Sequence, residues 1–249
     1  MLYRNSGRHS TRMNANYANV AGYGCSIRAV SRSFAAFTVA VLIGVGSVPA
    51  QSKGAGQGGP RKLLPRGEEI ALARSAAPRD VSKGATVWVF TDSGYAIAEK
   101  GTNGVACYVS RSWVESIEPH CFDAEGAATI LPMEMRMVEL RHRGMANDEV
   151  EREIATGLAS GRFRTPRRPA LSWMLSGAQQ LVNDEGTPVG RWRPHLMIYY
   201  PYLTAAELGL GPTPDLNGAV LVDGGTPTSN LMIITREFVQ PERPTSADR

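Results

Sequence analysis

The 249-residue chain has little cysteine and lacks the short motifs that identify several large enzyme classes. It contains no Gly-x-Ser-x-Gly nucleophile elbow, no His-Glu-x-x-His zinc helix and no Gly-x-x-x-x-Gly-Lys-Ser/Thr phosphate loop. A dinucleotide fingerprint between a strand and a helix is also missing, as is a Cys-x-x-Cys-His haem attachment. The sequence therefore identifies no reaction and no cofactor.

The N-terminal 50 residues have no acidic side chain and predict a cleaved signal peptide. Residues 1–33 are polar and basic, and the apolar run Phe34–Val45 follows. This run has about 12 residues, fewer than the roughly 20 that a membrane span needs. It ends before the small-residue site Val48-Pro49-Ala50, and the alternative is a buried core helix. We expect cleavage after Ala50, a periplasmic or extracellular location and no stable membrane anchor.

The positive net charge of the whole chain comes from the leader at residues 1–50. Five of the 27 Lys and Arg residues lie in residues 1–50, so the remainder has 22 basic and 23 acidic residues. A near-neutral protein gives no reason to expect a nucleic-acid partner. One cluster of arginines remains, and a solvated loop is the favoured interpretation over an anion site. The cluster consists of Arg162, Arg164, Arg167 and Arg168.

Removal of the leader also removes the odd cysteine, Cys25. Cys107 and Cys121 remain, and in an oxidising compartment we expect them to form a disulfide bond. Closing a loop of this length stabilises a fold by about 3 kcal/mol. A redox-active cysteine is the alternative, but the chain has no Cys-x-x-Cys pair.

Hydrophobic patterns predict an α+β fold, with a mostly antiparallel sheet and a helical insert in a single domain. The expected division is a flexible linker at 51–64, the domain at 65–240 and a disordered tail at 241–249. The expected helices are 66–76, 132–143, with Pro132 at its start, and 147–160, together with a short one at 204–208. The expected strands form a meander over 85–91, 95–99 and 105–110, followed by 170–175, 195–202, 219–222 and 231–237.

His195 is the centre of the predicted site, because the mature part contains only three histidines. Strand alternation places His195 and Met197 on one face, where Met232 could approach them. Imidazole and thioether ligands together suit copper. The alternative is that Met197 and Met232 fill the core and His195 is a satisfied polar residue.

Two other functions use the same histidine. Tyr200, Trp192 and Thr226 are candidate small-ligand contacts, with Thr226 in a Gly-rich turn that could hold an anion or form a plain connection. A secreted hydrolase or lyase would use His195 as general base with Asp223 orienting it. A structural envelope protein is the third possibility. The sequence does not indicate the oligomeric state.

Five short motifs in order resemble a group of exported bacterial proteins of unknown function. They are Gly101-Thr-Asn-Gly104 before Cys107, Cys121-x-Asp123, Ser172-Trp-Met-Leu175, Pro194-His-Leu-Met-Ile198 and Gly225-Thr-Pro227. In this chain Val105 replaces the aromatic residue usual after the first motif, and the insert before Ala170 is longer. The resemblance implies a secreted fold with His195 near its centre and implies no activity.

Overall fold

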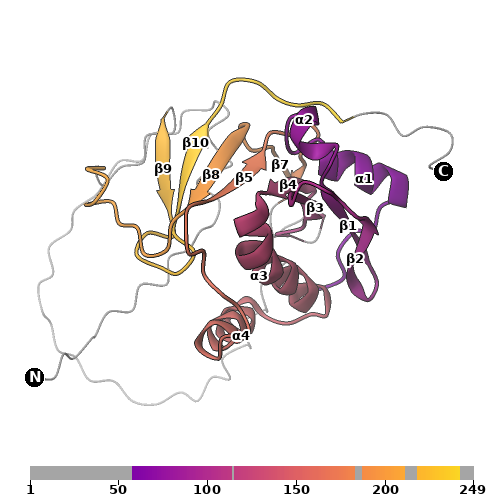
Figure 1. The fold of residues 1–249 in the computed structure, drawn as a ribbon. Coiled ribbons are helices and arrows are strands. Elements are labelled where there is room, and N and C mark those ends of the chain that lie inside the picture. The colour runs from indigo at the N-terminus through magenta and orange to yellow at the C-terminus, as the bar shows by residue number, and fades with distance from the viewer. Residues whose placement is uncertain (1–57, 114, 183–186, 211–217, 242–249) are drawn as a thin grey trace, which may run out of the picture.

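An eight-stranded sheet with helices on both faces forms the protein (Figure 1). The computed structural model describes residues 58–113, 115–182, 187–210 and 218–241, so the predicted signal peptide lies outside the described residues. The helices are α1 (Arg66–Arg74), α2 (Arg79–Ser82), α3 (Ala124–His142) and α4 (Asn147–Ala159). The strands are β1 (Thr86–Thr91), β2 (Gly94–Glu99), β3 (Ala106–Ser110), β4 (Glu118–Phe122), β5 (Ala170–Met174), β6 (Leu181–Val182), β7 (Pro188–Gly190), β8 (His195–Tyr199), β9 (Ala219–Val222) and β10 (Asn230–Ile234).

The strand order is β2-β1-β3-β4-β5-β8-β10-β9, and β6 and β7 form a separate pair. Every pairing in the large sheet is antiparallel except β1 with β3. The predicted α+β fold with a mostly antiparallel sheet is therefore confirmed. The predicted meander is not formed, because β3 crosses to the far side of β1 and runs parallel to it.

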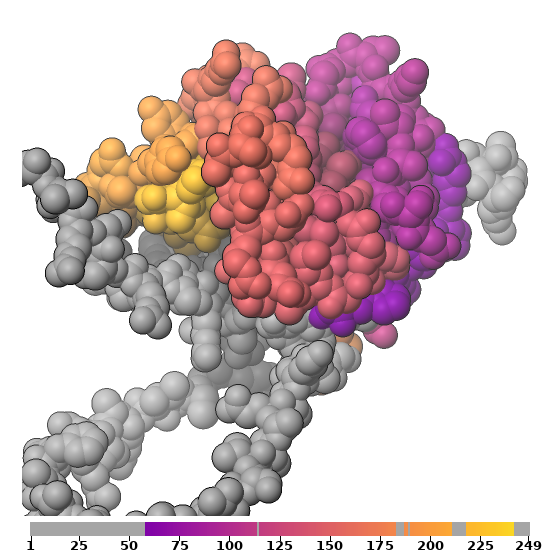
Figure 2. Space-filling view, turned by 90° about the horizontal axis from the view of Figure 1, so that it is seen from below, coloured from indigo at the N-terminus to yellow at the C-terminus, as the bar shows by residue number. Residues whose placement is uncertain are grey.

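Two clusters of buried side chains lie on opposite faces of the sheet. On one face α1 packs over β1, β3 and β4 through small residues such as Ala73, Val87 and Val109. On the other face α3 covers β3, β4 and β5 with larger residues, including Phe122, Ile130 and Met133. Figure 2 shows the outer side of this second layer, where α4 and the segment after it fill the centre of the view.

The helix α3 begins eight residues earlier than the sequence pattern predicts. The Asp123 carboxylate accepts a hydrogen bond from the Gly126 backbone N–H at 2.8 Å, which satisfies an amide that the first turn leaves unpaired. Pro132 therefore lies inside the helix and does not open it, at the cost of one backbone hydrogen bond. The strand β4 was also not expected, since Glu118-Pro119-His120 lacks the apolar alternation typical of a strand.

The disulfide lies where β3 and β4 are directly paired. Cys107 is opposite Cys121, and the two sulfur atoms are 1.99 Å apart, at disulfide distance. Both residues are fully buried in the cluster beneath α1. The bridge therefore joins neighbouring strands under the first helix.

The last part of the expected flexible linker contacts the domain. The Gly59 N–H donates to the Arg141 carbonyl at 2.9 Å, and the Arg61 N–H donates to Nδ1 of His142 at 2.8 Å. The Arg61 side chain is buried and donates to the Arg111 carbonyl at 3.2 Å. Residues 59 and 61 thus pack on the fold ahead of α1. None of the helices in the described ranges combines the length and the apolar composition of a membrane span.

Candidate functional site: a buried polar cluster under helix α3

Glu134 lies at the centre of a polar cluster between α3 and the sheet. Its Oε2 accepts a hydrogen bond from the Tyr108 hydroxyl and lies 3.3 Å from His120 Nδ1. Its Oε1 accepts from the Tyr199 hydroxyl at 3.2 Å. One helix residue thus binds side chains from β3, β4 and β8.

The cluster keeps a carboxylate charged inside the fold. Burial alone would raise the pKa of Glu134, but the charge and hydrogen bond of His120 and the two tyrosine hydroxyls outweigh it and lower that pKa. Burial, followed by the Glu134 charge, raises the pKa of Tyr108 and of Tyr199 well above the usual value. At neutral pH Glu134 is therefore an acceptor, and both phenols are donors.

His120 is held on two sides and has one nitrogen left over. Its ring lies 4.2 Å from the Phe122 ring and 5.7 Å from the Tyr108 ring, measured between centroids, and the residue is 2% exposed. Since the Glu134 carboxylate only accepts, Nδ1 of His120 carries the proton that it donates. The other ring nitrogen, Nε2, is buried and has no hydrogen-bond partner among the described residues.

Other buried polar atoms also lack partners, but they differ in chemistry. In the described part of the chain they are Glu69 Oε2, Arg111 Nη2, His120 Nε2, Ser172 Oγ, Gln179 Oε1 and Asn230 Oδ1. Arg111 Nη2 lies 2.9 Å from Glu69 Oε1, so it is in an ion pair without the alignment of a hydrogen bond. His120 Nε2 is the one atom in this set that offers a soft metal an imidazole nitrogen.

His195 has the same arrangement from a different strand. Its Nδ1 lies 2.6 Å from the Arg193 carbonyl oxygen, which can only accept, so Nδ1 carries the proton and Nε2 the lone pair. Burial lowers the pKa of His195 to about 4, opposed by the hydrogen bond to the Arg193 carbonyl and aided by the charge of His120. The ring is neutral at physiological pH.

The strand register places a methionine between the two histidines. Met174 is directly opposite His195 on the neighbouring strand. On its other side β5 pairs with β4, where Trp173 is opposite Cys121. Because the two strands are antiparallel, the next residues, Met174 on β5 and His120 on β4, are neighbours at that end of the pair. With strands about 4.8 Å apart, the two histidine backbones are separated by about 10 Å, with the Met174 side chain on the same face between them.

The predicted metal residues share this face. Met197 is directly opposite Met232, and His195 lies two residues from Met197 on β8. The Tyr199 hydroxyl lies 3.8 Å from the Met197 sulfur, which links this row to Glu134. The structure thus brings His195, Met197 and Met232 to one face and adds His120 and Met174 to them.

The predicted catalytic pair is not brought together. On β10, Asn230 is paired with Val222 of β9 and with Tyr199 of β8. Asp223 follows Val222, so it lies near the Tyr199 end of β8, whereas His195 lies at the other end. Four strand residues separate the two ends, which is about 13 Å. Burial, followed by the charge of Glu151, raises the pKa of Asp223, and within the described residues no hydrogen bond or ion pair joins Asp223 to His195.

The predicted ligand contacts divide between these two ends. Trp192 lies beside His195, with ring centroids 6.5 Å apart, and its Nε1 donates to Glu118 Oε2 at 3.3 Å. Tyr200 is exposed at the other end, and Thr226 donates its hydroxyl to the Asp223 carbonyl at 2.7 Å. The Thr226 backbone N–H also bonds within its own turn, so the turn does not present it to an anion.

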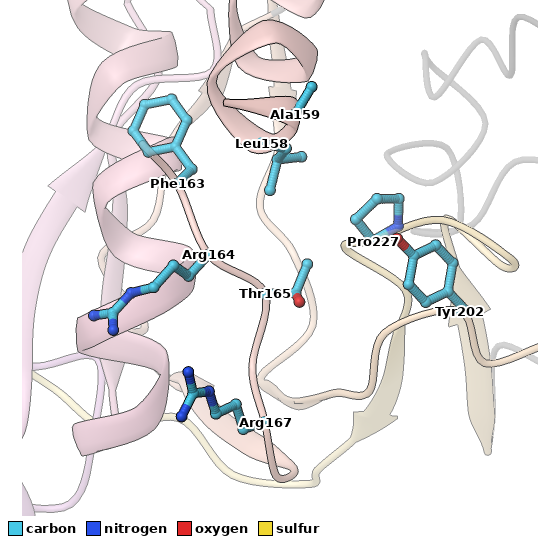
Figure 3. Close-up of a pocket in the computed structure, with 8 residues that line it drawn as sticks. All are labelled: Leu158, Ala159, Phe163, Arg164, Thr165, Arg167, Tyr202 and Pro227. Carbon is cyan, nitrogen blue, oxygen red and sulfur yellow. The ribbon is translucent and has the colours of Figure 1, made fainter. Parts of the chain in front are cut away.

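The hollows described on the surface lie away from the two histidines, and Figure 3 shows the larger of them. Neither of two shallow hollows on the described surface, of about 440 and 360 Å³, is lined by a histidine. In the same described ranges no group of three His, Cys, Asp or Glu side chains is arranged to hold a metal ion. A site here therefore needs methionine sulfur as a ligand.

The sequence predicted His195 as the centre of the candidate site and did not indicate His120, Glu134 or Met174 as its neighbours. Glu134 follows Ile130, Leu131 and Met133 on the buried part of α3, and an acidic residue within an apolar helix stripe indicates a buried partner. His120 was missed because β4 was not expected. Met174 was included in an expected strand, but the partner of that strand was unknown.

Known proteins add no assignment: no family model, no curated protein and no solved structure matches the chain. The resemblance to exported bacterial proteins thus stays a prediction.

Proposed function

We propose that the protein is exported and binds one soft metal ion, Cu(I), between His120 and His195. The ligands are Nε2 of each histidine and the sulfur of Met174, with Met197 and Met232 in the next row of the same face. Its location would be periplasmic or extracellular, as the leader at residues 1–50 predicts.

One observation carries the proposal. Both imidazoles have Nδ1 bound to an acceptor, the Glu134 carboxylate for His120 and the Arg193 carbonyl for His195. Metal-binding histidines show this arrangement, in which the second nitrogen fixes the tautomer and directs the free lone pair. Nε2 of buried His120 has no hydrogen-bond partner among the described residues, so no protein group competes with a metal for it.

The choice of metal follows from the donors. The proposed donors are thioether sulfur and neutral imidazole, which favour Cu(I), whereas magnesium, calcium and manganese prefer oxygen ligands. The low pKa of His195 leaves Nε2 free to bind metal at neutral pH without displacing a proton. A single ion also needs no cavity of the size of an organic ligand.

The test is a competition titration of the chain from residue 51 with Cu(I) and a chromophoric Cu(I) chelator. We expect one equivalent to bind. His120→Asn and His195→Asn keep a donor at the position of Nδ1 but remove Nε2, and each should weaken binding roughly 100-fold, the upper end of what loss of an outer-shell partner causes. Met174→Leu should weaken it as well, because it keeps the volume and removes the sulfur.

The control variants are His142→Asn and Met133→Leu. His142 accepts a hydrogen bond from the Arg61 N–H, and Met133 lies in the α3 core, so both test the same chemical changes away from the site. Both should bind Cu(I) as the unchanged chain does. Failure of the unchanged chain to bind Cu(I), or of Ag(I) to compete, would refute the proposal and favour a structural protein. Near-ultraviolet circular dichroism checks that each variant is folded.

A further inference from the structure

Residues 59–62, ahead of α1, are held on the fold at two places, and we call them the N-terminal strap. On one side the Arg61 N–H donates to Nδ1 of His142, the last residue of α3, at 2.8 Å. On the other side Nε of Arg111 donates to the Lys62 carbonyl at 2.8 Å, and Nε of Arg61 donates to the Arg111 carbonyl at 3.2 Å. The strap therefore joins the end of α3 to the segment after β3.

One of these contacts depends on the protonation of an imidazole. A backbone N–H only donates, so Nδ1 of His142 accepts and the ring is neutral, with its proton on Nε2. The other strap bonds end on carbonyl oxygens, among them the Arg141 carbonyl, which accepts from the Gly59 N–H at 2.9 Å. Carbonyls accept at every accessible pH. When the imidazole takes up a proton, both of its nitrogens become donors, and the bond from Arg61 is lost.

The strap residue that makes this bond is buried. Arg61 is 2% exposed, and its side chain is bound on the fold as well as its backbone. A donor that loses its acceptor in such a place is costly, because water does not easily replace the lost partner. The N–H of Arg61 must therefore move away from a protonated His142.

Charged groups on three elements surround the His142 ring. The Phe90 ring of β1 packs edge-on against the imidazole, with centroids 5.0 Å apart. The acids on these elements, Glu139 and Glu69, pair with arginines at 3.7 and 2.9 Å, and within the described ranges neither pairs with His142. The strap bond is thus the contact of the ring that protonation reverses. The charged groups are Arg61 on the strap, Glu139, Arg141 and Arg143 at the end of α3, and Arg111 and Glu69, which both contact Phe90.

We propose that the strap is a pH-sensitive device, closed on α3 while His142 is neutral and released when the imidazole takes up a proton. Release withdraws the Lys62 carbonyl from Arg111, whereas α1 stays fixed through the pair between Glu69 and Arg111. The device uses none of the proposed metal ligands, so it does not depend on the proposed function.

The experiment is amide hydrogen exchange of the metal-free chain from residue 51 at pH 7.5 and pH 5.0, with each rate divided by the intrinsic rate at that pH. Protection of the Gly59 and Arg61 amides should fall roughly tenfold or more in acid, the effect of leaving one buried donor without an acceptor. The Gln180 amide, which donates to the Ile117 carbonyl at 2.9 Å, reports on the sheet and should keep its protection.

Three variants sharpen the experiment. His142→Asn offers an amide oxygen as an acceptor that does not titrate, so its strap should stay protected at both pH values. His142→Phe removes the acceptor and should lower the protection at both. His195→Asn is the matched control, because His195 bonds to the Arg193 carbonyl and not to the strap, and it should respond to acid as the unchanged chain does.

Four outcomes would overturn the proposal. They are equal protection of the strap at the two pH values in the unchanged chain, an equal loss at Gln180, an equal loss in His142→Asn, and full protection in His142→Phe. An equal loss at Gln180 would show that acid loosens the whole fold and not the strap.

Discussion

The two faces of the sheet bury polar groups of different kinds. Beneath α1 lie the bonded sulfurs of Cys107 and Cys121, and α1 also supplies Glu69 to an ion pair with Arg111. Beneath α3 lie His120 and Glu134, with two tyrosine hydroxyls bound to the carboxylate. The first face holds a covalent bond and a guanidinium ion pair, whereas the second holds an imidazole, a carboxylate and two phenols joined by hydrogen bonds and an ion pair.

This difference separates stability from binding. Arg111 is charged at every accessible pH and donates to the Lys62 and Val109 carbonyls at 2.8 Å as well as pairing with Glu69. Such a group fixes α1 on the sheet and has nothing to offer a ligand. Nε2 of His120 has no hydrogen-bond partner among the described residues, and His195 is neutral at physiological pH, so the proposed metal binding belongs to the α3 face. Changes on the α1 side should therefore reduce stability and spare metal binding, and changes on the α3 side should do the reverse.

The largest expected effect is the loss of Arg111. Arg111→Met should lower the free energy of unfolding by about 3–5 kcal/mol at pH 7, because it leaves Glu69 buried without its counter-charge. Burial already raises the pKa of Glu69, chiefly opposed by Arg111, so the loss should shrink in acid as that carboxyl takes up a proton. Urea unfolding at pH 7 and pH 5 measures both values.

The matched control is Arg152→Met, which breaks an exposed pair with Asp148 and should cost under about 0.5 kcal/mol. The folded Arg111→Met protein should bind Cu(I) as tightly as the unchanged chain. Weaker binding in that variant would erase the distinction between the two faces.

The next effect is the pH dependence that His195 contributes. Its pKa is about 4 in the fold, below the value of 6.5 for an exposed histidine. Between these values the unfolded chain binds more protons, so stability falls as pH falls through this window, by about 3 kcal/mol in total. His195→Asn keeps a donor to the Arg193 carbonyl and removes the titration, so its stability should change less between pH 6.5 and pH 4. Parallel stability curves for the two proteins would show that His195 is not buried as described.

The smallest effect on stability is expected at Glu134. Glu134→Gln leaves at least one of its three donors without an acceptor and should cost about 1–3 kcal/mol. The same change removes the carboxylate that orients His120, so Cu(I) binding should weaken 10- to 100-fold. Glu139→Gln, on the same helix, is the comparison variant and should leave Cu(I) binding unchanged. A stability loss with full retention of Cu(I) affinity would make Glu134 purely structural.

Local patterns predicted much of this fold. The limits of β1, β2, β3 and β9 match the expected segments to within one residue, because turn residues such as Asp92 and Gly104 bound them. The helix α4 also ends just before Gly161, as its sequence predicts, and Gly161 has a positive φ of 75° that glycine adopts readily. Local patterns did not predict the start of α3, where the Asp123 cap begins the helix ahead of Pro132. They also did not predict β4, where pairing of Cys121 with its disulfide partner outweighs the unfavourable effect of Pro119 in a strand.

For a related reason, the sequence predicted only some residues of the candidate site. Periodicity within one strand placed His195 and Met197 on one face, and the register with β10 then aligned Met232. The partner of β5 on its other side was unknown, so His120 and Met174 could not be joined to them. Pairing between distant segments depends on the whole sheet, and one strand does not encode its neighbour.

X-ray absorption of the Cu(I)-loaded protein tests the central claim most directly, because it counts the atoms around the metal. The account predicts nitrogen at roughly 2.0 Å and sulfur at roughly 2.3 Å, distances usual for imidazole and sulfur ligands of first-row metals. Two nitrogens and at least one sulfur should be present, and His120→Asn should remove one nitrogen. A shell of nitrogen and oxygen alone, or a spectrum that His120→Asn leaves unchanged, would contradict it.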